Sequence, residues 1–186
     1  GSAPGGFGLP DAAAIELYED AIDQGITYID TAPGYERAQT QLGHILPRRR
    51  DELFVATKVA TSNGAEAVKI LEENLRDLRT DAVDLTYVHS MGHQDPTRVL
   101  APDGALAGLR QAQKRGLTRF IGFTAHHLPA HSLRLLQESE VDVIMVALNF
   151  ADRFTYDFEG KILPLARQSG VGIAAMKVYG GAPQME

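Results

Sequence analysis

The chain has 186 residues, of which 44% are hydrophobic and 23% charged, a composition typical of a globular protein with a full core. Its formal net charge is -6, with acids and bases interspersed, which excludes the basic stripe that a nucleic acid or an anionic membrane surface would require. The chain has no cysteine, which excludes disulfides and zinc–thiolate or iron–sulfur sites within it. The apolar runs are too short to span a membrane and the start lacks the features of a signal peptide, so the expected location is the cytoplasm.

The first 25 residues are expected to form a loop followed by a helix. Gly1-Ser2 fits either a cloning remnant or part of a loop that follows a strand outside the chain, and we expect the loop, running over residues 1–6. Pro10-Asp11 then predicts the start of a helix, with Asp11 as its cap and Gly25 as its end.

From that helix onward, short apolar runs alternate with amphipathic stretches, which is typical of βα units around a parallel sheet. Six strands are expected, over residues 26–30, 53–58, 83–89, 118–124, 141–149 and 172–177. Helices are expected over residues 38–46, 65–78 (with a capping box from Asn63 to Glu66), 104–115, 129–138 and 159–169.

The strands show little polar alternation, which indicates a parallel sheet covered on both faces and leaves an open doubly wound sheet and a barrel as alternatives. A doubly wound sheet predicts a glycine-rich phosphate loop after its first strand, but residues 31–35 contain one glycine. A TIM-type (β/α)8 barrel has eight units over about 250 residues. We therefore expect residues 1–186 to be a single α/β barrel domain with about six of the eight strands, lacking the first strand and the last βα units.

Polar side chains stand at the carboxyl ends of these strands, where parallel α/β barrels build their active sites. Burial would remove the proton of the Lys58 ammonium unless a carboxylate stabilised its charge, and Asp30 supplies one. The cation in turn lowers the pKa of a neighbouring phenol from about 10, which makes Tyr35 a better acid. A neutral His89 would hydrogen-bond and orient a substrate oxygen. The strand-end residues are Asp30, Lys58, His89, Thr124, Asn149 and Lys177.

These residues resemble the aldo-keto reductases. That family's motif Asp-Thr-Ala-x-x-Tyr appears as residues 30–35, its lysine strand as 56–59 and its histidine strand as 83–89, and the similarity extends through 115–122 to Gly180-Gly181. The resemblance implies NADPH as cofactor, with NADH as the alternative, and a small-molecule carbonyl substrate reduced to an alcohol. It also implies a catalytic tetrad of Asp30, Tyr35, Lys58 and His89, with Tyr35 as the proton donor.

The departures from the family pattern lie mainly among the cofactor contacts. A Ser-Asn pair of the family appears here as Thr124-Ala125, a Gln as Met145 and the aromatic residue that stacks on the nicotinamide as Met176. Near Tyr35, Glu36 replaces the usual Gly and Gln39 the usual Glu. The positions where the resemblance implies cofactor contacts are Ser2, Asp30, Thr124, Met145, Met176 and Lys177.

Two other functions remain as alternatives. One is a non-catalytic barrel of the same fold that senses a nucleotide or binds a partner, since fold membership alone does not establish chemistry. The other is a metal-dependent hydrolase, which the lysine between Asp30 and His89 fits poorly.

The histidines at 126, 127 and 131 have spacing that can bind metal, but they lack a nearby carboxylate, so we expect a structural or substrate-loop role and no metal. The physiological substrate and the oligomeric state are not predicted.

Overall fold

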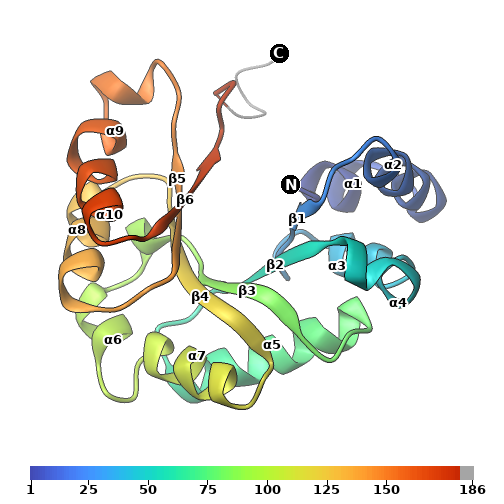
Figure 1. The fold of residues 1–186 in the computed structure, drawn as a ribbon, viewed down its shortest axis with the longest axis horizontal. Helices are drawn as coiled ribbons and strands as arrows, with labels where there is room; N and C mark the ends of the chain where they lie inside the picture. Colours follow the sequence, from blue (N-terminus) through green and yellow to red (C-terminus); the bar gives the residue numbers. More distant parts are fainter. Residues whose placement is uncertain (181–186) are drawn as a thin grey trace.

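The computed structural model describes residues 1–180 and contains, over that range, one six-stranded sheet. All neighbouring strands are parallel and follow one another in chain order from β1 to β6. The sheet curls strongly, with helices outside the curve and the edges formed by β1 and β6 facing one another across its open side (Figure 1). The strands are β1 (Tyr28–Asp30), β2 (Phe54–Val59), β3 (Val83–Val88), β4 (Thr118–Ala125), β5 (Val143–Ala147) and β6 (Gly172–Met176).

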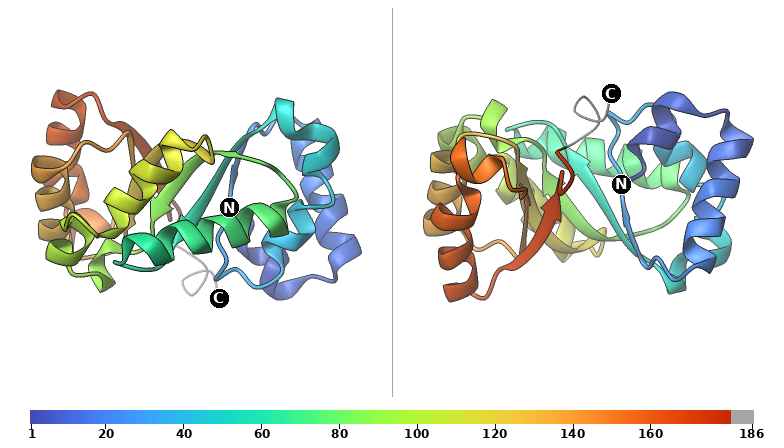
Figure 2. Two further views of the ribbon diagram at one scale, coloured as in Figure 1. Left: turned by 90° about the horizontal axis from the view of Figure 1, so that it is seen from below. Right: turned by 90° about the horizontal axis from the view of Figure 1, so that it is seen from above.

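The helices cover the convex face of the sheet, as the views from below and from above show (Figure 2). No helix in residues 1–180 combines the length and apolar character needed to cross a membrane. The longer helices are α2 (Asp11–Asp23), α5 (Gly64–Leu78), α7 (Ala105–Lys114) and α8 (Pro129–Glu138). The shorter ones are α1 (Ala3–Gly8), α3 (Ala38–Leu42), α4 (Leu46–Arg49), α6 (Pro96–Leu100), α9 (Phe158–Lys161), α10 (Leu163–Gln168) and the 3-10 turns η1 (Arg50–Glu52), η2 (Met91–His93) and η3 (Asp152–Phe154).

The expected N-terminal loop was wrong, because residues 3–8 form the helix α1. Packing explains the difference. Gly5 lies against the Tyr18 hydroxyl and Gly6 against the backbone carbonyl of Tyr35, so closely that an added Cβ would clash at both positions. Two glycines disfavour a helix in isolation, but here they allow it to lie directly on its neighbours.

Asp11 was also wrongly expected to cap α2. The cap position is Pro10, which offers no side-chain acceptor, and Asp11 is the first helical residue. Its carboxylate instead accepts a hydrogen bond from Gln41 at 2.9 Å and forms an ion pair with Arg37 at 3.1 Å. A carboxylate in the first turn still interacts favourably with the positive end of the helix dipole.

Two helices expected to be continuous are each divided. Between α3 and α4, Gly43 packs against the backbone carbonyl of Asp77 on α5, a close approach that only glycine permits. Between α9 and α10, Pro164 lies in the first turn of α10 and lacks the N–H that would continue a helix from the preceding turn. Helix α5 has half of the expected capping box: the Asn63 side chain accepts the Glu66 amide at 3.0 Å. The Glu66 carboxylate does not reach back to the Asn63 amide, because it accepts the Thr61 hydroxyl at 2.7 Å and the Asn63 amide donates to that hydroxyl at 3.1 Å.

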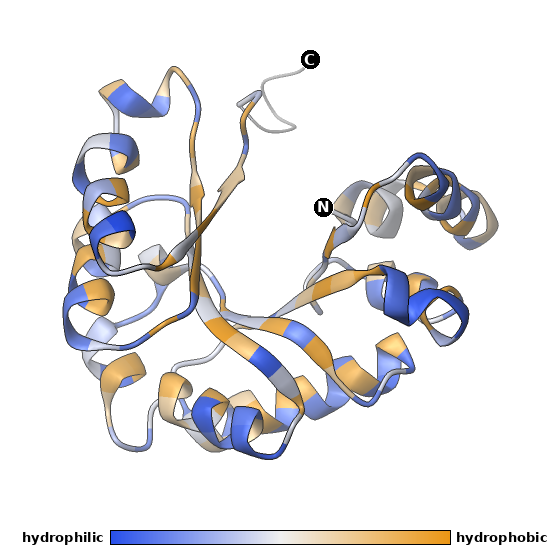
Figure 3. Ribbon diagram, viewed as in Figure 1, coloured by the Kyte–Doolittle hydropathy of each residue, from blue (hydrophilic) through white to orange (hydrophobic). Residues whose placement is uncertain are grey.

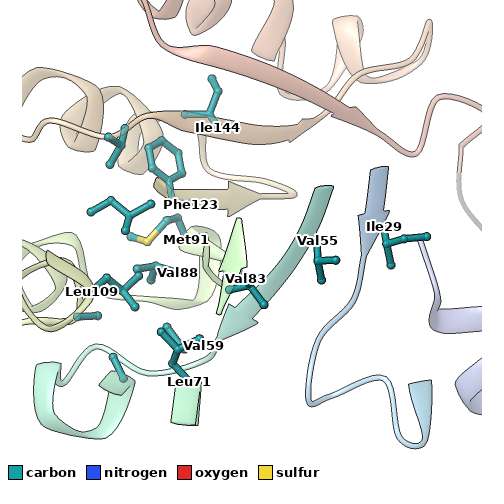
Figure 4. Packing of buried hydrophobic residues seen from close by; sticks show 14 of the residues in the cluster. Ile29, Val55, Val59, Leu71, Val83, Val88, Met91, Leu109, Phe123 and Ile144 are labelled. Carbon is teal, nitrogen blue, oxygen red and sulfur yellow. The ribbon is translucent and has the colours of Figure 1, made fainter. Parts of the chain in front are cut away.

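The main core lies between the sheet and its helices. Strand residues such as Val55, Val88 and Phe123 pack there against Leu71 of α5 and Leu109 of α7 (Figure 4). Hydrophobic residues accordingly concentrate on the strands and on the helix faces turned toward them (Figure 3). A second, smaller apolar cluster lies on the concave face and consists of Ala56, Leu85, Tyr87 and Met145.

Candidate active site

A buried ion pair joins the carboxyl ends of β1 and β2. Asp30 is the last residue of β1, and Lys58 lies one residue before the end of β2. The Lys58 ammonium donates to Asp30 Oδ1 at 2.7 Å and to the Thr31 carbonyl at 2.8 Å. The Lys58 side chain is only 2% exposed, so these two oxygens replace water as its partners.

Tyr35 lies on the loop after β1, which folds back over the ion pair. Its backbone N–H donates to the Ala32 carbonyl at 3.0 Å, and its own carbonyl accepts the Ala38 amide at 3.0 Å, where α3 begins. These bonds place the Tyr35 ring with its centroid 4.6 Å from the Lys58 ammonium nitrogen. A cation over the face of an aromatic ring is an attractive arrangement.

His89 completes the group. It follows β3 directly, and its backbone amide donates to the Val59 carbonyl at 2.9 Å. Its ring meets the Tyr35 ring edge-on, with 6.4 Å between centroids. Burial, reinforced by the positive charge of Lys58, lowers the pKa of His89 to about 4. The imidazole is therefore neutral near pH 7 and retains one N–H donor.

The concave face of the sheet borders a cavity of about 780 Å³. Asp30 and Tyr35 line its β1 side, and Met145, Met176 and Lys177 line its β5 and β6 side. The wall between them is mostly apolar, with Lys177 immediately after the end of β6 as a cation at the rim. A cavity of this size accommodates a cofactor-sized group beside a small substrate.

Comparison with known proteins identifies the family. A model described as the Aldo/keto reductase family matches residues 3–182. The chain belongs to the aldo/keto reductase family.

Among curated relatives, this aldo-keto reductase is similar to the methylglyoxal reductase DkgB of Escherichia coli O157:H7, with 30% identity over 176 residues. The match covers 92% of the chain and 63% of that relative, so the chain spans less than two thirds of its length. The aldo-keto reductase YhdN of Bacillus subtilis strain 168 is 36% identical over 96 residues, covering 44% of the chain and 29% of YhdN.

Among solved structures, the chain matches one described as an aldo-keto reductase from Pseudomonas aeruginosa with a TM-score of 0.81 and 26% identity, over 98% of the chain and 73% of that protein. An aldo-keto reductase from Klebsiella pneumoniae, solved in complex with NADPH, has the same fold, with a TM-score of 0.74 and 22% identity over 89% of the chain and 57% of that protein. The six parallel strands thus form a curled part of a (β/α)8 barrel, which confirms the fold class predicted from the sequence.

Three other predicted site residues of this aldo-keto reductase, Thr124, Ser2 and Asn149, lie outside the group formed by Asp30, Tyr35, Lys58 and His89. Thr124 is fully buried, and its hydroxyl accepts the Ser90 amide at 2.8 Å. Ser2 precedes α1 and donates its backbone N–H to the Asp30 carbonyl at 2.9 Å, while its buried hydroxyl has no hydrogen-bond partner within residues 1–180. Asn149 donates to the Lys177 carbonyl at 3.1 Å and to Asp152 at 3.0 Å, so it holds the loops after β5 and β6 together. Gly181, the end of the expected motif match, lies outside the described residues.

The histidines at 126, 127 and 131 do not lie together in the structure. His127 packs edge-on against His93, with 4.6 Å between ring centroids, and His131 is hydrogen-bonded through Nδ1 to the Met91 carbonyl at 2.9 Å. Over residues 1–180 no group of three or more histidine, aspartate or glutamate side chains is arranged to hold a metal ion. His126, in contrast, lines the large cavity together with Tyr35.

A buried polar network that was not predicted from the sequence lies behind Lys58. The Thr57 hydroxyl donates to Gln39 at 2.6 Å, Gln39 donates to Asn74 at 3.0 Å, and Asn74 donates to Thr57 at 3.1 Å and to the Lys58 carbonyl at 2.9 Å. All three side chains are buried. The network joins α3, which follows the Tyr35 loop, to β2, which carries Lys58. Only the unusual Gln39 and an Asn on the apolar face of a helix hinted at it in the sequence.

Proposed function

We propose that the protein reduces an aldehyde or ketone to an alcohol, with NADPH as the hydride donor and Tyr35 as the general acid. The observation that carries this proposal is the position of the buried Lys58 ammonium, which contacts the Asp30 carboxylate and faces the Tyr35 ring at the carboxyl ends of the strands. The relative DkgB is named a methylglyoxal reductase, which supports carbonyl reduction as the reaction class.

The four side chains have separate roles in this reaction. Tyr35 gives its proton to the carbonyl oxygen as that oxygen gains negative charge. The Lys58 cation stabilises the phenolate that remains, and the Asp30 carboxylate pairs with the Lys58 ammonium in its buried position. The neutral His89 donates a hydrogen bond to the same oxygen and orients the substrate. The cofactor, when bound, supplies the hydride.

The apolar wall and the positive charge of the cavity suit a nicotinamide cofactor. Its apolar wall, which includes Met145 and Met176, suits the face of an aromatic ring, and Lys177 at the rim suits a phosphate. Thr124 departs from this pattern, because its buried hydroxyl is bonded to the Ser90 amide instead of facing the cavity. We therefore assign cofactor contacts to Met145, Met176 and Lys177 first, with NADPH preferred and NADH as the alternative.

The experiment that tests the proposal is Tyr35→Phe in the whole protein. The change removes the proton donor and keeps the ring over Lys58, so kcat should fall by at least about 10²- to 10⁴-fold while NADPH affinity changes by no more than a few-fold. Steady-state kinetics measures kcat. Nicotinamide fluorescence measures cofactor binding. Near wild-type turnover would show that another group donates the proton, and His89 is the next candidate.

The second candidate is a nucleotide-sensing or partner-binding barrel without catalysis, which the buried Thr124 hydroxyl and the methionines at 145 and 176 favour. The two functions differ in a direct assay. A reductase oxidises NADPH when aldehydes are supplied, whereas a sensor binds NADPH and leaves it intact with every carbonyl compound in a broad panel.

A further inference from the structure

The loop that carries Tyr35 has few contacts of its own with the core. It connects β1 to α3, and the residues around Tyr35, namely Pro33, Gly34, Glu36 and Arg37, are all exposed. Glu36 has a φ of 47°, a left-handed conformation that is strained for a residue with a side chain. Such a conformation persists only where the surrounding structure determines it. The position of the Tyr35 ring therefore depends on what holds the backbone of this loop.

The segment that contains α1 contacts this loop at both of its ends. The Ser2 amide, just before α1, donates to the Asp30 carbonyl at 2.9 Å, where the loop leaves β1. At the other end, Gly6 lies so close to the Tyr35 carbonyl that an added Cβ would clash with it. The same carbonyl accepts the Ala38 amide at 3.0 Å, where α3 begins. One short helical segment thus contacts the backbone of both the carboxylate partner of the ion pair and the general acid.

Buried hydrogen bonds hold α1 in this place. Gln41 of α3 is 1% exposed, and its amide nitrogen donates to the Gly5 carbonyl at 3.3 Å and to Asp11 Oδ1 at 2.9 Å. The Tyr18 hydroxyl of α2 donates to the Ser2 carbonyl at 2.8 Å. Both hydrogens of the Gln41 amide have acceptors, so this contact has a defined geometry. Gln41 therefore ties α3 to α1 and to the first turn of α2.

We propose that α1 holds the general acid in position, with Gly6 and Gln41 as positioning residues that act through Tyr35 and do not touch the substrate. Gly6 sets how closely α1 approaches the loop, and Gln41 keeps the helix there. A displacement of about 1 Å can lower a rate as much as 10²-fold, because proton transfer requires close alignment. This inference rests on the proposed function and extends it to a segment outside the four site residues.

The test adds one methyl group to α1 at either of two positions. Gly6→Ala places a Cβ against the Tyr35 carbonyl, so α1 and the loop must move apart. Gly8→Ala makes the same change later in the same helix, where the space is open, and is the matched control. In the whole protein, we expect kcat to fall about 10²-fold in Gly6→Ala with NADPH affinity within about 3-fold of wild type. In Gly8→Ala, kcat should change by no more than about 2-fold.

A double variant shows whether the effect passes through Tyr35. If α1 acts by positioning this residue, Gly6→Ala has little further effect once the phenol is gone. The Gly6→Ala, Tyr35→Phe protein should therefore have a kcat within about 3-fold of that of Tyr35→Phe alone. A general loss of structure would instead lower the residual rate of Tyr35→Phe by the same factor as it lowers the wild-type rate.

Amide hydrogen exchange gives a second readout that requires no turnover. The Ala38 amide, which is bonded to the Tyr35 carbonyl, should exchange at least about 10-fold faster in Gly6→Ala than in Gly8→Ala. Gln41→Leu removes the bonds to α1 and α2 without a clash and should change exchange and kcat in the same direction. It replaces Gly6→Ala if circular dichroism and thermal unfolding show that Gly6→Ala does not fold.

The outcomes separate the two proposals. Losses of kcat that multiply in the double variant, or equal exchange of the Ala38 amide in Gly6→Ala and Gly8→Ala, overturn the positioning role of α1 while leaving the reductase function intact. A wild-type protein that reduces no aldehyde in a broad panel with NADPH or NADH overturns the proposed function and this inference with it.

Discussion

At the scale of single residues, the site depends on what burial does to charge. A buried ammonium needs oxygens in place of water, and Lys58 has two, at 2.7 and 2.8 Å. Burial lowers the pKa of both His89 and His126 to about 4, so both rings are neutral near pH 7. The site thus holds one paired cation, Lys58, and two neutral imidazoles.

The roles of Lys58 and Asp30 in the proposed reaction can be separated by mutation. Lys58→Met removes the cation beside Tyr35, so kcat should fall about 10²-fold or more through a weaker acid. Asp30→Asn keeps an oxygen for Lys58 to contact and should reduce kcat less. Steady-state kinetics over a range of pH measures both variants. A greater loss in Asp30→Asn than in Lys58→Met would show that the carboxylate itself takes part in proton transfer.

The buried histidines make stability depend on pH in a defined window. Unfolding returns their pKa from about 4 to about 6.5, so between these values the unfolded chain binds more protons than the folded one. Their contribution to stability is complete above about pH 6.5 and is lost as the pH falls toward 4. We expect the melting temperature to drop less steeply over this window in a His89→Gln, His126→Gln double variant than in wild type. Identical slopes in thermal unfolding experiments would contradict the lowered pKa values.

At the scale of elements, the network of Thr57, Gln39 and Asn74 links the two segments that carry the acid and the cation. Helix α3 starts three residues after Tyr35 and is tied through Gln39 to Thr57, the neighbour of Lys58 on β2. Asn74 of α5 adds a bond to the Lys58 carbonyl. Since every member has a partner, the network fixes the distance between the Tyr35 loop and β2.

Thr57→Val tests whether this link matters for catalysis. The change keeps the side-chain shape but leaves Gln39 and Asn74 each without one partner, which should destabilise the fold by about 1–3 kcal/mol. It should also lower kcat about 10-fold with little change in KM, because Tyr35 and Lys58 are no longer held in a fixed position relative to each other. Thr86→Val is the matched control, since Thr86 is a buried threonine of β3 that bonds Thr118 away from the site. An equal loss of kcat in both variants would indicate general destabilisation.

At the scale of the whole molecule, Asp84 holds three strands together at the end of the sheet opposite the site. Its buried carboxylate accepts the Val55 amide at 2.8 Å and pairs with Arg50 at 2.8 Å and Arg119 at 2.7 Å, so it connects β2, β3 and β4. Burial opposes ionisation of Asp84, but the hydrogen bonds from Val55 and Arg119 and the charge of Arg50 outweigh it and lower the pKa. The contribution of Asp84 to stability is therefore present above the ordinary aspartate pKa and is lost in stronger acid.

Asp84→Ala should accordingly destabilise the protein by about 1–3 kcal/mol at pH 7, because the buried Val55 amide loses its acceptor. Glu73→Ala removes an exposed carboxylate that pairs weakly with Lys69 and Arg76 on α5, and should change stability by about 0.5 kcal/mol or less. Urea unfolding followed by circular dichroism measures both. Equal effects would show that Asp84 behaves as a surface charge despite its burial.

The sequence by itself determined the parallel α/β fold and the order of its strands, because apolar periodicity and turn residues are local signals. It also placed Asp30, Lys58 and His89 at strand ends, since parallel strands end on one side of a sheet and such a position can be read from the chain. His126 also follows a strand end, that of β4, although the spacing of the histidines at 126, 127 and 131 suggested a metal site.

Only the tertiary structure decided the features that depend on contacts between distant segments. Helix α1 forms because Gly5 and Gly6 fit against Tyr18 and the Tyr35 loop, a contact that overrides the poor helix propensity of glycine. Gln39 and Asn74 are 35 residues apart, and their pairing exists only once α3 and α5 pack on β2. The protonation of His126 likewise follows from its burial. Local sequence determines which elements form, whereas burial and partners, which decide charge and hydrogen bonding, are set by how those elements pack.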